Sequence, residues 1–90
     1  MKSRKKVNLM MHTNRLNKYI HRTGKGRWVV AEYDKALDLY VAPMDLRERQ
    51  RTGLRALTAN SPDGLESISY SNRASALRRA EREFDARAHQ

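Results

Sequence analysis

The sequence lacks cysteine altogether, and this absence excludes disulfide bonds and thiolate zinc sites. It suits a reducing compartment, so we predict a cytoplasmic location. Long apolar runs are missing too, because the longest one near the start, Leu9-Met10-Met11, is far too short for the apolar core of a signal peptide. The sequence therefore predicts a protein without a membrane partner, and 90 residues are enough for one domain.

Acidic residues are absent from the first 27 positions, and the first carboxylate of the chain is Glu32. That stretch holds nine Lys and Arg residues, whereas residues 28–90 hold ten basic and ten acidic residues. The formal net charge of +9 therefore belongs to one end of the chain. A one-sided field of this kind attracts polyanions and speeds their encounter with the protein.

We divide the chain into a basic arm, residues 1–26, and a single small α+β domain, residues 27–90. A short helix is expected within the arm over residues 14–22, because Thr13 can cap its start and Gly24 can end it. The rest of the arm is expected to be loosely held and to carry positive charge.

The strongest structural prediction is a β-hairpin over residues 27–42, because both of its strands are rich in aromatic and β-branched side chains. If Asp34 and Lys35 form a two-residue loop, Val30 lies opposite Leu39. The expected core face is then Trp28, Val30, Leu37, Leu39 and Val41. The expected outer face is Val29, Ala31, Tyr33, Asp38 and Tyr40. A longer loop with a shifted register stays open, since Asp-Lys is not a preferred pair for this turn.

A second helix is expected from Asp45 to about Ala59, because Asp45 and Glu48 have the spacing of a capping box. Its inward side chains would be Leu46, Leu54 and Leu57. A turn follows over residues 60–64, and residues 65–70 are a candidate third strand.

The last element is expected to be a helix over residues 72–88, capped by Ser71 or Asn72 and carrying a narrow apolar stripe. The stripe consists of Ala74, Leu77, Ala80, Phe84 and Ala88. The predicted fold class is therefore α+β, a small antiparallel sheet of two to three strands packed by a C-terminal helix, with one or two additional helices and a basic N-terminal arm. The protein would be a monomer or a homodimer, because an exposed hairpin edge can pair with a second copy.

The strand that begins at Trp28 and the Ala-rich segment 71–80 loosely resemble small sheet-plus-helix DNA-binding domains, such as integrase arm-binding domains. They are equally similar to short proteins of bacteriophages. The resemblance identifies no family, and no residue role follows from it.

Catalytic patterns are missing from the sequence. The three histidines, His12, His21 and His89, stand in no metal-ligand or triad spacing. The segment 32–35 has the acid-then-lysine order of metal-dependent nucleases, but no acid precedes it to share a metal. The Gly24-Lys25-Gly26 run lacks P-loop spacing. We therefore expect no enzymatic activity, no metal and no cofactor.

The leading hypothesis is a small nucleic-acid-binding accessory protein that contacts the phosphate backbone of DNA or RNA through its Lys and Arg side chains. The candidate contact residues at the basic end are Lys2, Arg4, Lys5, Lys6, Arg15, Lys18, Arg22, Lys25 and Arg27. Four-residue steps would add a basic ridge of Arg47, Arg51 and Arg55 on the second helix. Arg78 and Arg82 would form a shorter ridge on the last helix.

Two other functions are consistent with the sequence. One is a phage-type inhibitor, anti-CRISPR-like, that docks on an acidic host protein or nucleoprotein complex, with Tyr33 and Tyr40 as its contact residues. The other is a small ribonuclease toxin, for which the chain offers no convincing set of acid–base residues.

Overall fold

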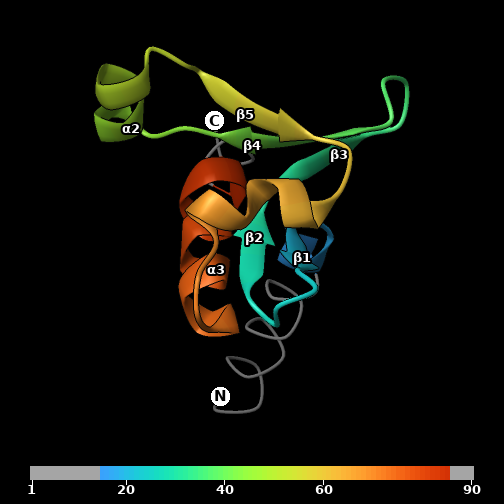
Figure 1. Cartoon of the computed structure of the whole chain (residues 1–90). Coiled ribbons are helices and arrows are strands. Elements are labelled where there is room, and N and C mark those ends of the chain that lie inside the picture. The colour runs from blue at the N-terminus through green and yellow to red at the C-terminus, as the bar shows by residue number, and fades with distance from the viewer. Residues whose placement is uncertain (1–14, 86–90) are drawn as a thin grey trace.

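The structure is a computed structural model that describes residues 15–85 of the chain (Figure 1). It confirms the predicted α+β class, with two small antiparallel sheets instead of one. The first sheet pairs β1 (Ile20–Arg22) with β2 (Trp28–Val30), and the second has the order β3 (Glu32–Asp34), β4 (Leu39–Pro43), β5 (Ala56–Ala59).

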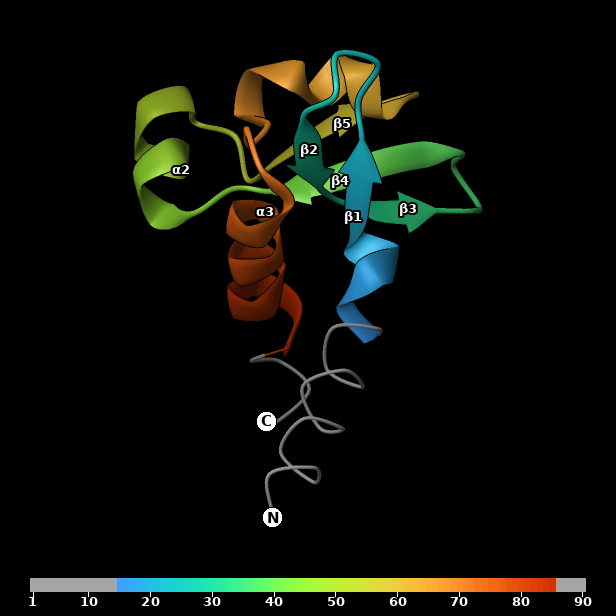
Figure 2. The same cartoon turned by 90° about the horizontal axis from the view of Figure 1, so that it is seen from below.

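Short helices join and cover these strands (Figures 1 and 2). They are the 3-10 helices η1 (Asn17–Tyr19) and η2 (Pro62–Ile68), the α-helices α2 (Leu46–Thr52) and α3 (Arg73–Ala80), and the π-helical turn η3 (Glu81–Asp85) that continues α3. The C-terminal helix α3 packs on the first sheet, as the sequence predicts.

The core is organised around β2 and the residue that follows it. Val29, Val30 and Ala31 are all buried, and because successive side chains of an extended chain point to opposite faces, both faces of this segment must be covered. Val30 packs with β1 and α3, through Ile20, Ala76 and Ala80. Val29 and Ala31 pack on the other face with Ala42 and Leu65. Their assignment to an outer face is therefore wrong, because η2 brings Leu65 over them.

The segment 15–22 differs from the helix that the sequence predicts. Helical structure ends at Tyr19, and residues 20–22 form a strand in which Ile20 lies opposite Val30. Leu16 and Ile20 are buried, so part of the segment assigned to the basic arm lies in the core of the fold.

The hairpin between β3 and β4 has a four-residue loop, which confirms the longer-loop alternative and contradicts the two-residue one. Tyr33 lies opposite Tyr40, and Asp34 lies opposite Leu39. The Asp34 carboxylate accepts hydrogen bonds from two backbone N–H groups of the loop, those of residues 36 and 37. Leu37, expected in the core, lies in this loop with 65% of its surface exposed.

The helix predicted over 45–59 is wrong beyond Thr52. Gly53 adopts a left-handed conformation (φ 76°) at the helix end, which glycine does without steric cost. Residues 56–59 then form β5 against β4. Leu46 and Leu54, expected to point inward, are 70% and 47% exposed.

The end of the chain agrees more closely with the sequence. Asn72 caps α3 by accepting a hydrogen bond from the Ser75 N–H, and Ala80 is buried while Ala74 is exposed. Residues 65–70 are not a strand, because most of them belong to η2, and Tyr70 pairs only in an isolated bridge with Trp28.

Candidate nucleic-acid interface

Helix α2 is an outlying element that buries none of its seven residues. It stands at one corner of the molecule, beyond the ends of β4 and β5 (Figure 1). Arg47, Gln50 and Arg51 follow at three- and four-residue steps and share one side of the helix, next to Leu46. All four are exposed, so α2 presents a cationic surface with one large apolar side chain.

Polar contacts at its first turn attach α2 to the body. The sequence-predicted capping box is confirmed: the Glu48 N–H donates to Asp45 Oδ1, and the Asp45 N–H donates to Glu48 Oε2, both at 2.8 Å. The Arg49 side chain also donates through Nε to the Met44 carbonyl at 2.9 Å. Met44 itself is buried.

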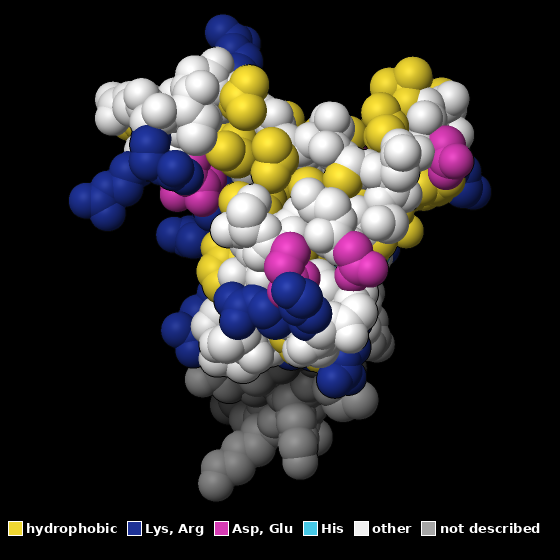
Figure 3. All heavy atoms as spheres, in the orientation of Figure 1, with side chains coloured by type: hydrophobic (Ala, Val, Ile, Leu, Met, Phe, Trp, Pro, Cys, Tyr) yellow, Lys and Arg dark blue, Asp and Glu magenta, His cyan; other side chains and the backbone are white. Residues whose placement is uncertain are grey.

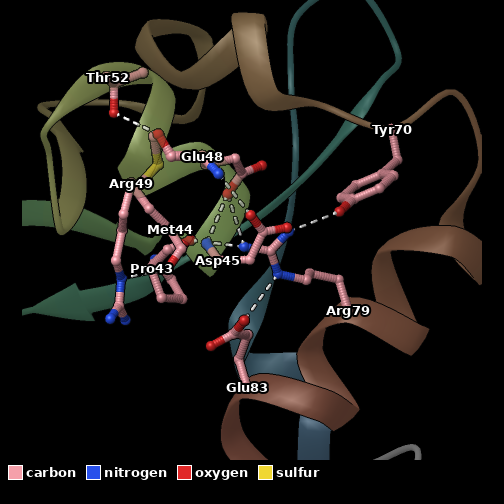
Figure 4. Close-up of polar contacts among 9 residues, drawn as sticks. All are labelled: Pro43, Met44, Asp45, Glu48, Arg49, Thr52, Tyr70, Arg79 and Glu83. Carbon is pink, nitrogen blue, oxygen red and sulfur yellow. Dashed lines mark hydrogen bonds and ion pairs between the residues drawn. The ribbon is translucent and has the colours of Figure 1, made fainter.

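Arg79 joins this capping box to α3 (Figure 4). Its Nη2 atom donates to Glu48 Oε2 at 3.1 Å and to the Pro43 carbonyl at 3.0 Å, and its Nε donates to Glu83 Oε1 at 3.1 Å. Only 6% of Arg79 is exposed. Burial alone would lower the pKa of Arg79, but the hydrogen bonds to Glu48 and Tyr70 outweigh burial and raise it, so the guanidinium stays charged.

We expect the N-cap hydrogen bond of Asp45 to persist at pH values below the ordinary pKa of an aspartate. The hydrogen bond from the Glu48 N–H lowers the pKa of Asp45, and the Arg79 charge lowers it further. Because the pKa of Asp45 is lower in the folded state, its ionised carboxyl stabilises the fold. This stabilisation is complete above the pKa of the unfolded state, about 3.9, and is lost as the pH falls through the pKa of the folded state. The Glu48 amide resonance should therefore titrate with a midpoint below about 3.9. Asp45→Asn keeps a capping acceptor and should abolish this titration.

Four of the sequence-predicted contact residues, Lys2, Arg4, Lys5 and Lys6, lie outside the described residues. Among the others, Arg15 forms an ion pair with Asp85. Arg27 donates to the Ser69 side chain and carbonyl and lies 3.7 Å from Glu66 Oε1. These two arginines therefore make contacts within the fold.

Arg22, Lys18 and Lys25 are exposed. The Arg22 guanidinium lies over the Trp28 ring, 5.3 Å from its centroid, and the Lys18 ammonium lies 5.2 Å from the centroid of the Tyr19 ring. Such contacts orient cationic side chains without neutralising their charge.

The ridge predicted at Arg47, Arg51 and Arg55 is broken by the end of α2. Arg47 and Arg51 lie on the helix, whereas Arg55 follows Gly53 and precedes β5. All three arginines are exposed.

The shorter predicted ridge, Arg78 and Arg82, is exposed on α3 and its continuation. Both residues line an open groove together with Tyr70, Ser75 and Glu81. Arg82 is also close enough to Asp45, the N-cap of α2, to lower the pKa of that carboxyl.

The charge of the described surface is unevenly distributed. Arg side chains follow the edge formed by α2 and α3, on the left in Figure 3. The β3–β4 hairpin lies on the opposite side and carries Glu32, Asp34 and Asp38 against a single base, Lys35. The α2–α3 edge also holds Asp45, Glu48 and Glu83, but all three are paired with Arg79. Its exposed arginines therefore make it the surface suited to a polyanion.

Tyr33 and Tyr40 share one face of the hairpin, as the sequence predicts, with ring centroids 5.0 Å apart. His21 adds an edge-on contact to Tyr40 at 4.9 Å. The Tyr33 hydroxyl donates to Asp38, and this hydrogen bond, with desolvation and nearby carboxylates, raises the pKa of Tyr33. The Tyr33 ring is thus held beside acidic groups, an unfavourable place for a phosphate.

Sequence reasoning missed three features of this region: Arg79, Gln50 and the exposure of Leu46. Arg79 had a detectable signal, because Glu83 follows it at the four-residue spacing of a helical ion pair, and the structure contains this pair. Its contacts with Glu48 and Pro43 depend on the tertiary fold.

Within residues 15–85, no group of three or more His, Cys, Asp or Glu side chains is placed to hold a metal ion. The same residues contain no helix with the length and apolar character needed to cross a membrane. Comparison of the chain with protein-family models, curated proteins and solved structures found no match.

Proposed function

We propose that this protein is a nucleic-acid-binding accessory protein of the cytoplasm. The observation that carries the proposal is the first 27 residues, which hold nine Lys and Arg residues and no acid. The exposed arginines of the α2–α3 edge, Arg47, Arg51, Arg78 and Arg82, supply a second basic surface. Phosphate contacts of this kind give affinity and orientation without reading sequence.

The internal partners of Arg15 and Arg27 change the contact set that this proposal needs. A guanidinium already bound to Asp85 or Ser69 would have to give up that contact before binding a phosphate. The contact residues that we favour are therefore Lys2, Arg4, Lys5, Lys6, Lys18, Arg22 and Lys25, together with the α2–α3 edge.

Fluorescence polarisation of the full-length protein with labelled single-stranded and duplex DNA and RNA tests the proposal. If about six phosphates are neutralised, affinity should fall roughly 10³-fold between about 50 and 200 mM salt. A full-length variant with Lys2, Arg4, Lys5 and Lys6 changed to Gln should bind more weakly and with a shallower salt slope. Lys35→Gln is a single-charge control, because it removes one positive charge from the acidic hairpin. Absent or salt-independent binding to every polymer would contradict the proposal.

The exposed hairpin supports a second candidate, a phage-type inhibitor that docks on a host protein or nucleoprotein complex. Tyr33 is 38% exposed and Leu37 is 65% exposed on an element that extends from the body. An aromatic and an aliphatic side chain at one tip can form a compact protein contact. Under this function, the double variant Tyr33→Ser, Leu37→Ser should lose partner capture, and nucleic-acid affinity should be unchanged.

A further inference from the structure

We infer that the polymer bound is double-stranded DNA and that α2 enters its major groove with Arg47, Gln50 and Arg51 facing the base edges. This inference rests on the proposed function and names its ligand. It begins from the shape of α2, a helix with no buried residue that stands at a corner of the fold (Figure 1). Because none of its residues is buried, its outer face is available to a partner.

The size of α2 fits one kind of groove. An α-helix with its side chains is about 10–12 Å across, and the major groove of B-form DNA is about 12 Å wide. The major groove of A-form RNA is too deep and narrow for side chains to read. Insertion of α2 therefore favours duplex DNA over duplex RNA, and a single strand offers no groove.

The side chains on the exposed side of α2 match the chemistry of base edges. Arginine donates two hydrogen bonds to guanine O6 and N7, and the glutamine amide pairs with adenine N6 and N7. Around the helix the order is Leu46, Gln50, Arg47, Arg51, so Gln50 lies between the apolar side chain and the two arginines. Leu46, 70% exposed, provides an apolar contact of the kind that thymine methyl groups accept.

The remaining contacts of α2 keep this set in a fixed position. Glu48 is occupied by the capping box and by Arg79, so the one carboxylate of the helix faces the body and not the DNA. Arg82 is close enough to Asp45, the N-cap of α2, to lower the pKa of that carboxyl, and Arg78 lines the same groove as Arg82. They are suited to the phosphates that flank an occupied groove. Specific DNA recognition requires base contacts from a rigid element and phosphate contacts that position this element, and the two groups of side chains on this edge are suited to these two roles.

Methylation footprinting with dimethyl sulfate tests groove insertion directly, because the reagent modifies guanine N7 in the major groove. The probe is a duplex, selected from a randomised pool for binding to the full-length protein, that carries guanines on both strands. Bound protein should protect two or more guanines within a few neighbouring base pairs. The same duplex sequence made as RNA should bind at least roughly tenfold more weakly, since its major groove excludes α2.

Two exposed substitutions separate base reading from phosphate binding. Gln50→Ala should lower affinity for the selected duplex roughly 5- to 150-fold and relax its sequence preference at one position. Arg82→Gln should weaken binding to all duplexes alike and reduce the salt slope by about one. Both positions are exposed, so circular dichroism should be unchanged, and Lys35→Gln is the charge control.

Unprotected guanine N7 atoms in the saturated complex, or equal affinity for the RNA duplex, would overturn the inference and leave the proposed function standing. Absence of binding to every polymer would overturn both. A Gln50→Ala variant with wild-type sequence preference would show that Gln50 reads no base and would contradict the set of reading residues inferred here.

Discussion

Replacing Arg79 by methionine should destabilise the fold by about 3–5 kcal/mol, the usual cost of removing one partner from a buried ion pair. The substitution removes the guanidinium donor of Glu83 and the Pro43 carbonyl, and it leaves Glu48 with the Asp45 N–H but without its cationic partner. A methionine fills similar volume, so the loss reports the unpaired polar groups and not a cavity. The free energy of unfolding of a small domain is about 5–15 kcal/mol, so this loss would remove a large part of it.

Thermal unfolding of the variant measures this loss, and a change of about 1 kcal/mol moves the melting temperature by about 4–8 °C in a domain of this size. The matched control is Arg78→Met, which changes the exposed neighbour on the same helix and should cost no more than about 0.5 kcal/mol. Arg79→Lys should recover little, because one ammonium cannot supply the planar set of donors that reaches three acceptors. Equal melting temperatures for the two methionine variants would contradict this role for Arg79.

Signals that act within a few residues predicted the structure well. The capping box at Asp45 and Glu48 and the cap at Asn72 are both present. Each depends on side chains three or four positions apart, so no knowledge of the rest of the chain was needed.

Errors arose where distant segments decide the outcome. Ile20–Arg22 reads as the end of an amphipathic helix, but hydrogen bonds to Trp28–Val30 make it a strand. The segment 56–59 continues a helical pattern, yet Gly53 stops the helix and β4 recruits the segment as β5. Burial of Val29 on the supposed outer face follows only from the position of η2.

The sequence predicted which basic residues belong to the candidate site, but it did not predict how α2 is oriented. Arg47, Arg51, Arg78 and Arg82 were visible as basic residues at four-residue steps. The pattern assigned α2 an inward face at Leu46, because apolar spacing cannot distinguish a helix that packs from one that stands free. The direction in which α2 points depends on Arg79, a contact between residues 31 positions apart in the sequence.

Gly64→Ala should destabilise the fold by about 1–3 kcal/mol, the usual cost of overpacking. A Cβ atom built on Gly64 would lie 2.6 Å from the Ala59 Cβ, and neither atom belongs to a flexible side chain. Gly64 does not have a positive φ, so steric contact and not backbone conformation excludes a side chain there. To make room, η2 would have to move away from β5, and its buried Leu65 would leave the cluster that covers Val29.

A second variant tests this steric explanation by removing the Ala59 Cβ, the atom that the new Cβ at position 64 would overlap. In Ala59→Gly, Gly64→Ala the new Cβ is 3.8 Å from the Ala59 Cα, an ordinary contact. Ala59→Gly alone should cost about 0.5–1 kcal/mol, because glycine weakens a strand. The double variant should then be more stable than Gly64→Ala, since relief of the overlap exceeds that cost. Additive losses in urea unfolding would mean that the close approach of η2 to β5 does not set the requirement for glycine at position 64.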